Sequence, residues 1–215
     1  MSQQPTLIAT TRARITVLFI AAAGLALSAC TGPAGAEPSA SPAPAASAPA
    51  TQRPDPTYKP ASENGPAENV PVPVMPDEAS LKSQQGLQAF LPYWFETVSY
   101  AYETGDLTPL EQITAPGCAI CKEFKKTIQA GHDGDKWIVG GQIEPTEIED
   151  RFVETVDGKY APIVFITQQP LVIYEDDKVV GKADGFVDPL LWVATVRYVE
   201  DHWIIEGVAR PDGAS

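Results

Sequence analysis

Residues 193–208 read VATVRYVEDHWIIEGV, two alternating runs that meet at Glu200-Asp201. Alternation of apolar and polar residues indicates β-strands, and a two-residue connection between two such runs predicts a hairpin. In this register three pairs face each other on one side of the hairpin: Tyr198 with Trp203, Val196 with Ile205, and Ala194 with Gly207. The other side is either solvated or part of a site, and it carries Thr195, Arg197, His202 and Glu206.

Before the hairpin the apolar pattern is first helical. Apolar residues recur at spacings of three and four between Leu87 and Tyr102, which predicts a helix that begins near Asp77 and ends at Gly105. Pro92 should kink this helix or begin a second segment. A short second helix is expected at residues 108–111, with Thr108 as its cap, and a third from about Cys118 to Ala130.

After Trp137 the pattern alternates. Strands are expected near residues 142–155, 160–175, 189–199 and 202–209, with turns at Asp157-Gly158 and Glu175-Asp176-Asp177. Helices followed by a meander predict an α+β domain in which N-terminal helices pack on one face of a curved antiparallel sheet.

The N-terminus has the pattern of a lipoprotein signal. Arg12 and Arg14 precede a run of thirteen residues from Ile15 to Leu27 with no charged side chain, and Leu27-Ser28-Ala29-Cys30 closes it. A membrane-spanning helix needs about 20 apolar residues, so a retained span is the weaker interpretation. An ordinary secretory peptide cleaved nearby is the other alternative. We expect cleavage before Cys30, a diacylglyceryl group on its thiol, and anchoring at the extracytoplasmic face of the cell membrane.

Three regions follow from this pattern. Residues 1–29 form the signal peptide, residues 30–76 form the lipidated cysteine with a Pro/Ala/Ser-rich tether, and residues 77–215 form the folded domain. The second part of the tether, from Tyr58 to Met75, places apolar groups on an extended frame. It should lie against the domain, although a free linker remains an alternative.

Charge and cysteine count limit the partners. Without residues 1–29, which contain two arginines and no acidic residue, the net charge goes from −13 to −15. Such a surface repels nucleic acid, so the expected membrane contact is through the lipid anchor. Cys118 and Cys121 are then the remaining cysteines, and export favours a disulfide between them. A redox pair, reduced core thiols and a zinc site completed by both histidines stay open as alternatives.

Four segments resemble an actinobacterial lipoprotein family of unassigned function: residues 58–62 (YKPAS), 65–73 (GPAENVPVP), 100–106 (YAYETGD) and 118–121 (CAIC). The order of helices and sheet, ending in Asp201-His202-Trp203-Ile204-Ile205, resembles the nuclear-transport-factor-2-like cone fold over roughly residues 80–210. The first resemblance implies no catalytic residues. The second implies either an enzyme with an Asp/His pair in the cone, such as an isomerase or dehydratase, or a binding module.

The aromatic residues either line a cavity in the cone or form its core. The candidate pocket set is Tyr93, Trp94, Tyr100, Trp137, Trp192, Tyr198 and Trp203. His132 is expected in a polar surface loop and His202 at the polar hairpin end, with no nucleophile beside either. The sequence therefore predicts a non-catalytic domain, without metal or cofactor, that binds an envelope protein or a small apolar ligand. A small-molecule acid-base enzyme is the alternative, and a structural role in the cell wall comes third.

Overall fold

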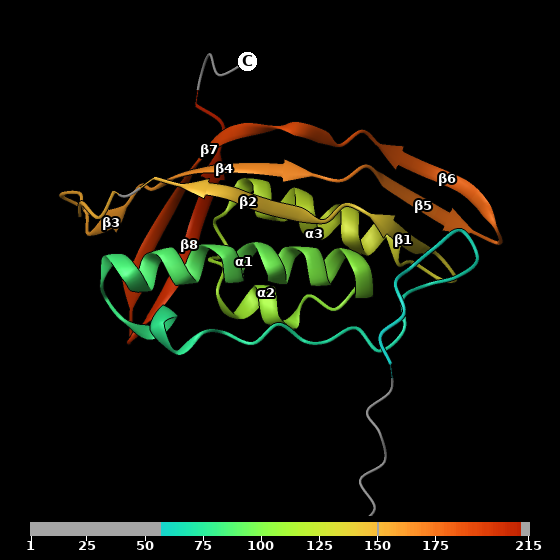
Figure 1. The fold of residues 1–215 in the computed structure, drawn as a ribbon, viewed down its shortest axis with the longest axis horizontal. Coiled ribbons are helices and arrows are strands. Elements are labelled where there is room, and N and C mark those ends of the chain that lie inside the picture. The colour runs from blue at the N-terminus through green and yellow to red at the C-terminus, as the bar shows by residue number, and fades with distance from the viewer. Residues whose placement is uncertain (1–56, 150, 212–215) are drawn as a thin grey trace, which may run out of the picture. The chain divides into compact units, whose positions relative to one another are not determined.

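The computed structural model describes residues 57–149 and 151–211 (Figure 1). The expected signal, Cys30 and the first part of the tether lie outside these residues. A short 3₁₀ helix, η1 (Asp77–Ser80), precedes three α-helices: α1 (Gln84–Thr104), α2 (Thr108–Gln112) and α3 (Ala119–Gly131). The strands are β1 (Trp137–Gly140), β2 (Ile143–Ile148), β3 (Lys159–Tyr160), β4 (Ile163–Gln168), β5 (Leu171–Glu175), β6 (Lys178–Ala183), β7 (Phe186–Val199) and β8 (His202–Ala209). The predicted α+β order is confirmed.

Helix α1 is one uninterrupted helix, and it begins later than the sequence indicated. The Ser83 side chain accepts a hydrogen bond from the Gly86 amide and caps it, while Asp77–Ser80 forms a separate 3₁₀ turn. The expected alternative of a second segment at Pro92 is wrong, because buried side chains on both sides of the proline hold one continuous helix against the core. Gly105 ends it in the left-handed conformation, with φ of 78°, as predicted.

Helix α2 is capped from outside its own first turn. Thr108 was expected to be the cap, but it is the first helical residue. Asp106 accepts a hydrogen bond from the Thr108 amide at 2.9 Å and takes over the role. Helix α3 begins directly after Cys118, as expected, and its buried side holds Cys121 and Ile128.

Two antiparallel sheets form the rest of the fold. The larger has the order β2-β4-β7-β3, with β8 also paired to β7, and the smaller has the order β1-β5-β6. The last hairpin pairs Tyr198 with Trp203 and Val196 with Ile205, as predicted. The Ala194–Gly207 pair is wrong, because an irregularity after Thr195 shifts the register and Ala194 pairs with Val208.

The chain passes between the two sheets at three places, and these define a bend. Residues 141–142 join β1 to β2, residues 169–170 join β4 to β5, and residues 184–185 join β6 to β7. A Cβ atom on Gly140 would lie 2.0 Å from the Pro170 carbonyl oxygen, and one on Gly185 would lie 2.3 Å from that of Gln168. Only glycine permits this close approach of backbones. At the right of Figure 1 the smaller sheet continues the larger one beyond the bend.

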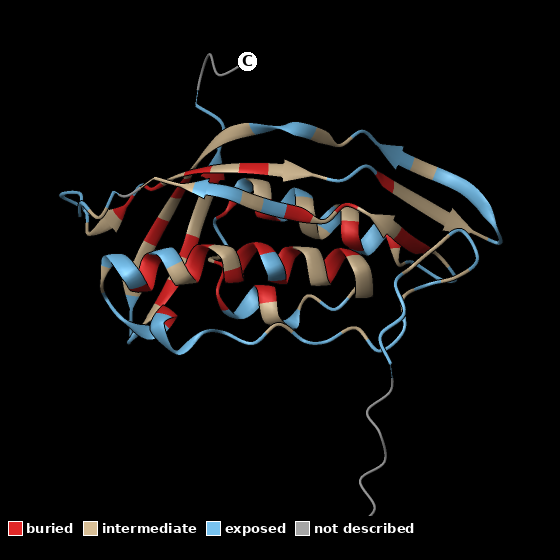
Figure 2. Cartoon of the chain, in the orientation of Figure 1, coloured by how far each residue is buried: buried red, intermediate tan, exposed pale blue. Residues whose placement is uncertain are grey.

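The core lies between the helices and the sheet. Buried residues lie on the sides of α1 and the strands that face each other (Figure 2). Trp94 and Trp203 are the largest fully buried side chains, and their indole N–H groups donate to Thr114 Oγ1 at 2.8 Å and to the Leu81 carbonyl oxygen at 3.0 Å. Among residues 57–149 and 151–211, no helix is long and apolar enough to cross a membrane.

Residues 57–75, which we call the strap, lie against the domain as expected. Their first part forms a small hairpin in which Lys59 pairs with Glu68 and Ser62 with Gly65. The Trp137 indole N–H donates to the Ser62 carbonyl oxygen at 2.8 Å, and residues 70–73 lie beside α1. The ordered unit therefore includes residues on the N-terminal side of Asp77.

Candidate ligand site at the bend of the sheet

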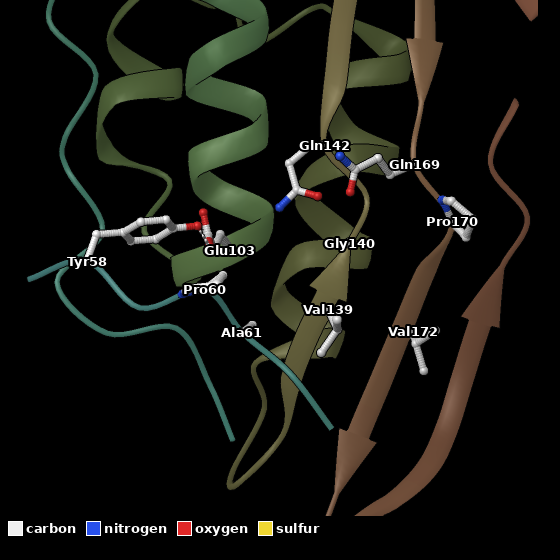
Figure 3. Close-up of a pocket in the computed structure, with 10 residues that line it drawn as sticks. All are labelled: Tyr58, Pro60, Ala61, Glu103, Val139, Gly140, Gln142, Gln169, Pro170 and Val172. Carbon is white, nitrogen blue, oxygen red and sulfur yellow. Dashed lines mark hydrogen bonds between the residues drawn. The ribbon is translucent and has the colours of Figure 1, made fainter. Parts of the chain in front are cut away.

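A cavity of about 610 Å³ lies where the strap, the end of α1 and the bend meet; we call it the bend cavity (Figure 3). Its volume is in the range of small-molecule sites. The strap, α1 and both sides of the bend contribute its lining: Tyr58, Pro60, Ala61, Glu103, Val139, Gly140, Gln142, Gln169, Pro170 and Val172.

Tyr58 and Glu103 join the strap wall to the end of α1. The Tyr58 hydroxyl donates to Glu103 Oε1 at 2.5 Å. Burial, and next the hydrogen bond to Glu103, raise the pKa of Tyr58 to about 12. The phenol therefore stays protonated at neutral pH and keeps donating to the carboxylate.

Gln142 and Gln169 bring two side-chain amides to the other side of the cavity, and in Figure 3 their amide groups lie close together in the view. Backbone bonds hold this side: the Gln169 amide donates to the Gln142 carbonyl oxygen at 2.9 Å. Gln142 Oε1 is buried and has no hydrogen-bond partner among the described residues. In Figure 3 this oxygen lies on the Gln169 side and the Gln142 amide nitrogen lies on the Glu103 side, so the polar group that Gln142 turns toward Glu103 is a hydrogen-bond donor.

The charge in this lining is negative. Glu103 is half-buried, and no lysine, arginine or histidine lines the bend cavity. Within the described part of the chain Glu103 takes part in no ion pair, although ten other pairs are present there. The charged side chain in this lining is therefore a carboxylate without a cationic partner.

The seven aromatic residues of the candidate pocket do not share this cavity. Tyr93, Trp94, Trp137 and Trp203 are buried in the core, and the Tyr198 hydroxyl donates to the Ser80 carbonyl oxygen at 2.7 Å. Tyr100 lines a cavity of about 320 Å³ between strap and α1. Trp192 lines a largely apolar groove of about 500 Å³ beside the start of α3, and its indole N–H is buried without a partner among the described residues. Large rings fill the space enclosed by the sheet, which leaves the cavities at the edges.

The histidines lie in different parts of the domain. His132 was expected in a surface loop, but it is half-buried at the end of α3 and its Nε2 donates to the Tyr102 carbonyl oxygen at 2.8 Å. Burial lowers the pKa of His132. His202 lies with its Nδ1 3.0 Å from the Glu200 carbonyl oxygen. Neither histidine lines the bend cavity.

The polar side of the last hairpin is an ion-pair network. Arg197 Nε lies 2.6 Å from Glu206 Oε1, and Lys159 Nζ lies 3.0 Å from Glu206 Oε2. The Arg197 hydrogen bond is the main cause that lowers the pKa of Glu206. This side therefore pairs β3 with the hairpin through the charges of Lys159, Arg197 and Glu206.

Cys118 and Cys121 form a disulfide at the start of α3. Both residues are buried, and the Cys118 sulfur accepts a hydrogen bond from the Cys121 amide at 3.3 Å. The bridge thus fixes the first turn of the helix. In the described residues no cluster of three or more His, Cys, Asp or Glu side chains is arranged to hold a metal ion.

Sequence reasoning missed the residues of the bend cavity. Glu103, Gln142 and Gln169 belong to no motif, and Tyr58 reaches Glu103 across 45 residues of chain. The signal that was present is the pair of breaks at Gly140-Gly141 and Gln169-Pro170, which interrupt alternating runs. Breaks at matching places in paired strands indicate a bend, and the bend forms one side of the cavity.

Helices held within a curved antiparallel sheet, with the enclosed space filled and an open cavity at the bend, define a cone-like domain of the nuclear-transport-factor-2-like class. The chain belongs to the Family of unknown function (DUF6318), which matches residues 56–209. The search of curated proteins found no match.

Solved structures with a similar arrangement include three of low identity. The intermembrane space region of the chloroplast protein ARC6 shares 10% identity over 60% of this chain and 98% of that chain, with a TM-score of 0.41. Aln2 from a Streptomyces species shares 10% identity over 58% of this chain and 90% of that chain, with a TM-score of 0.34. A variant of Rd1NTF2_05 shares 9% identity over 57% of this chain and 97% of that chain, with a TM-score of 0.31. Likenesses this weak carry no inference about function.

Proposed function

We propose that this protein is a non-catalytic binding module of the cell envelope, anchored through a lipid on Cys30, which takes a small ligand or a partner segment in the bend cavity. The observation that carries the proposal is the bend cavity itself, a space of about 610 Å³ lined by the Glu103 carboxylate and by the side-chain amides of Gln142 and Gln169. A cavity of this size with a few polar groups among apolar walls is typical of small-molecule sites. The polar amides also favour a ligand with polar groups over the purely apolar one expected from the sequence.

Binding is favoured over acid-base catalysis by the high pKa of Tyr58 and by the residue types of the lining. An efficient general acid or base has a pKa near the working pH. The pKa of Tyr58 is about 12, far above neutral pH. No serine, threonine, cysteine, lysine or histidine lines the bend cavity, so it offers none of the commonest nucleophiles.

Anchoring is supported by the pattern from Arg12 to Cys30 and by the Pro/Ala/Ser-rich stretch that connects it to the strap. Two acyl chains give stable attachment where a single chain binds marginally. Cys30→Ser should abolish incorporation of a clickable fatty acid and move the protein out of the membrane fraction. Unchanged labelling in that variant would exclude Cys30 as the lipidation site.

Binding is tested by screening small polar fragments with ligand-observed NMR on the full chain purified in detergent. Gln142→Leu keeps the approximate size of the side chain and removes its polar amide from the lining, and Gln129→Leu is the matched control on an exposed position of α3. Fragments that bind the wild type and the control, but not Gln142→Leu, support the site. Fragments that bind all three proteins equally, or a screen without hits, would contradict it.

A further inference from the structure

The bend cavity contains a carboxylate that is only partly paired, and this restricts its ligand. Glu103 receives one hydrogen bond, from Tyr58 to Oε1. The second carboxylate oxygen of Glu103 has no hydrogen bond or ion pair with the described residues. One carboxylate oxygen therefore remains for a ligand, and it is matched by a donor.

The charge balance restricts the sign of the ligand. No cationic side chain lines the bend cavity, while Glu103 is a half-buried carboxylate. The whole chain has a net charge of −13. An anionic ligand would face repulsion with no compensating cation, whereas an ammonium group would pair with Glu103 in surroundings less polar than water.

The remaining surfaces are aliphatic. Pro60 and Ala61 of the strap face the cavity from one side, and Val139, Pro170 and Val172 line it from the bend (Figure 3). No aromatic side chain other than Tyr58 lines it. These surfaces suit a short methylene chain, because flexible alkyl groups pack well against proline and valine.

We infer that the bend cavity binds a primary ammonium group at the end of a short aliphatic chain, with the ammonium beside the carboxylate of Glu103. This rests on the proposed function, because it names the ligand class of the same cavity. The ammonium donates to the Glu103 oxygen that Tyr58 leaves free, and the alkyl part contacts the proline and valine walls. A free amine and a lysine-like side chain of an envelope component share this chemistry.

The first arm of the test separates the charge of the ligand from its shape. Pentylamine, pentan-1-ol and sodium pentanoate are titrated into the full chain in detergent, and amide shifts at Val139, Gly140 and Gln142 are followed by NMR. Pentylamine should bind saturably, at least tenfold more tightly than pentan-1-ol, and pentanoate should not bind. Binding should weaken as sodium chloride is raised, because salt screens the exposed part of the ion pair.

The second arm tests the residues. Glu103→Gln keeps an acceptor for Tyr58 and removes the charge, so it should weaken pentylamine at least tenfold while pentan-1-ol binds as before. Glu96→Gln removes an exposed carboxylate of the same helix, outside the bend cavity, and should change pentylamine affinity by less than twofold. A lysine-containing peptide that competes with pentylamine would identify a side chain as a ligand source, while a peptide that fails to compete would favour a free amine.

The two proposals fail differently. Pentan-1-ol or pentanoate binding as tightly as pentylamine, or an unchanged pentylamine affinity in Glu103→Gln, would overturn the ammonium inference and leave the cavity as a binding site. If no probe and no screened fragment shifts the amides of the bend, both the inference and the proposed function are wrong.

Discussion

The contact between Trp137 and the strap can be tested by Trp137→Phe, which keeps an aromatic ring and removes one hydrogen-bond donor. The indole N–H donates to the Ser62 carbonyl oxygen at 2.8 Å, and the ring stacks on Tyr174 with 5.6 Å between centroids. Phenylalanine preserves the stacking. The variant should therefore loosen the strap while the rest of the domain stays folded.

The size of the effect follows from the value of one neutral hydrogen bond. Such a bond contributes about 0.5–1.5 kcal/mol net, and about 1.4 kcal/mol is a factor of ten in an equilibrium constant. The population of the open strap should then rise about 2- to 13-fold. An isolated two-stranded hairpin is marginal in water, so the strap hairpin should lose its protection when the strap leaves the domain.

Native-state hydrogen exchange measures this opening directly. The amides of Lys59, Ser62 and Glu68 donate within the strap hairpin and should exchange about 2- to 13-fold faster, in line with the value of that one bond. Trp192→Phe is the matched control, because it removes an indole N–H that has no partner among the described residues. Unchanged exchange of these amides in Trp137→Phe, or equal acceleration in both variants, would refute the role given to the Trp137 bond.

Three further predictions concern stability. Gly86→Ala should lower the free energy of unfolding in urea by about 1–3 kcal/mol, since the new Cβ would lie 2.0 Å from the Leu81 carbonyl oxygen. The control Gly117→Ala, whose Cβ would have nothing within 4 Å, should change this free energy by less than about 0.5 kcal/mol. Equal effects of the two variants would contradict the close packing at Gly86. Burial holds the pKa of His132 below its ordinary 6.5, so the stability that the neutral His132 contributes is complete above pH 6.5 and is lost as pH falls through the lower folded pKa. His132→Gln should therefore reduce the loss of stability between pH 7 and pH 5. An identical pH profile in this variant would disprove the prediction. Replacing Cys118 and Cys121 by serine should lower the free energy of unfolding by about 2 kcal/mol, the low end of the usual range for a disulfide, because the closed loop is short. Two thiols that alkylate freely in the native exported protein would rule out the bridge.

The fold was largely predictable because its strongest patterns are local. Alternation in residues 193–208 predicted the last hairpin, and the spacing from Leu87 to Tyr102 predicted α1. The register beyond Thr195 was not predictable, since a bulge leaves the alternation of apolar residues almost unchanged. The second segment expected at Pro92 was wrong for a related reason. The local chemistry of proline predicts an interruption, but the burial of the helix on both sides of Pro92 keeps α1 continuous.

The smaller sheet and the candidate site were harder to predict. Strand β6 is largely exposed on both faces, so it lacks the alternation that identifies a half-buried strand. Strand β1 is only four residues long. The bend cavity combines Tyr58, Glu103 and Gln142 from three distant parts of the chain, and no local pattern states that they meet.

The long-range origin of the bend cavity has a consequence for the order of folding. Its strap wall is held by bonds that join residues 45 and 75 positions apart, Tyr58 to Glu103 and Ser62 to Trp137. Contacts of large separation close costly loops, so they form after the helices and the local hairpins. Few of the strap's residues are buried, which also makes it one of the easiest parts to reopen. A chain can therefore have a complete hydrophobic core before it has the bend cavity, and the strap wall of this cavity is among the last parts to form.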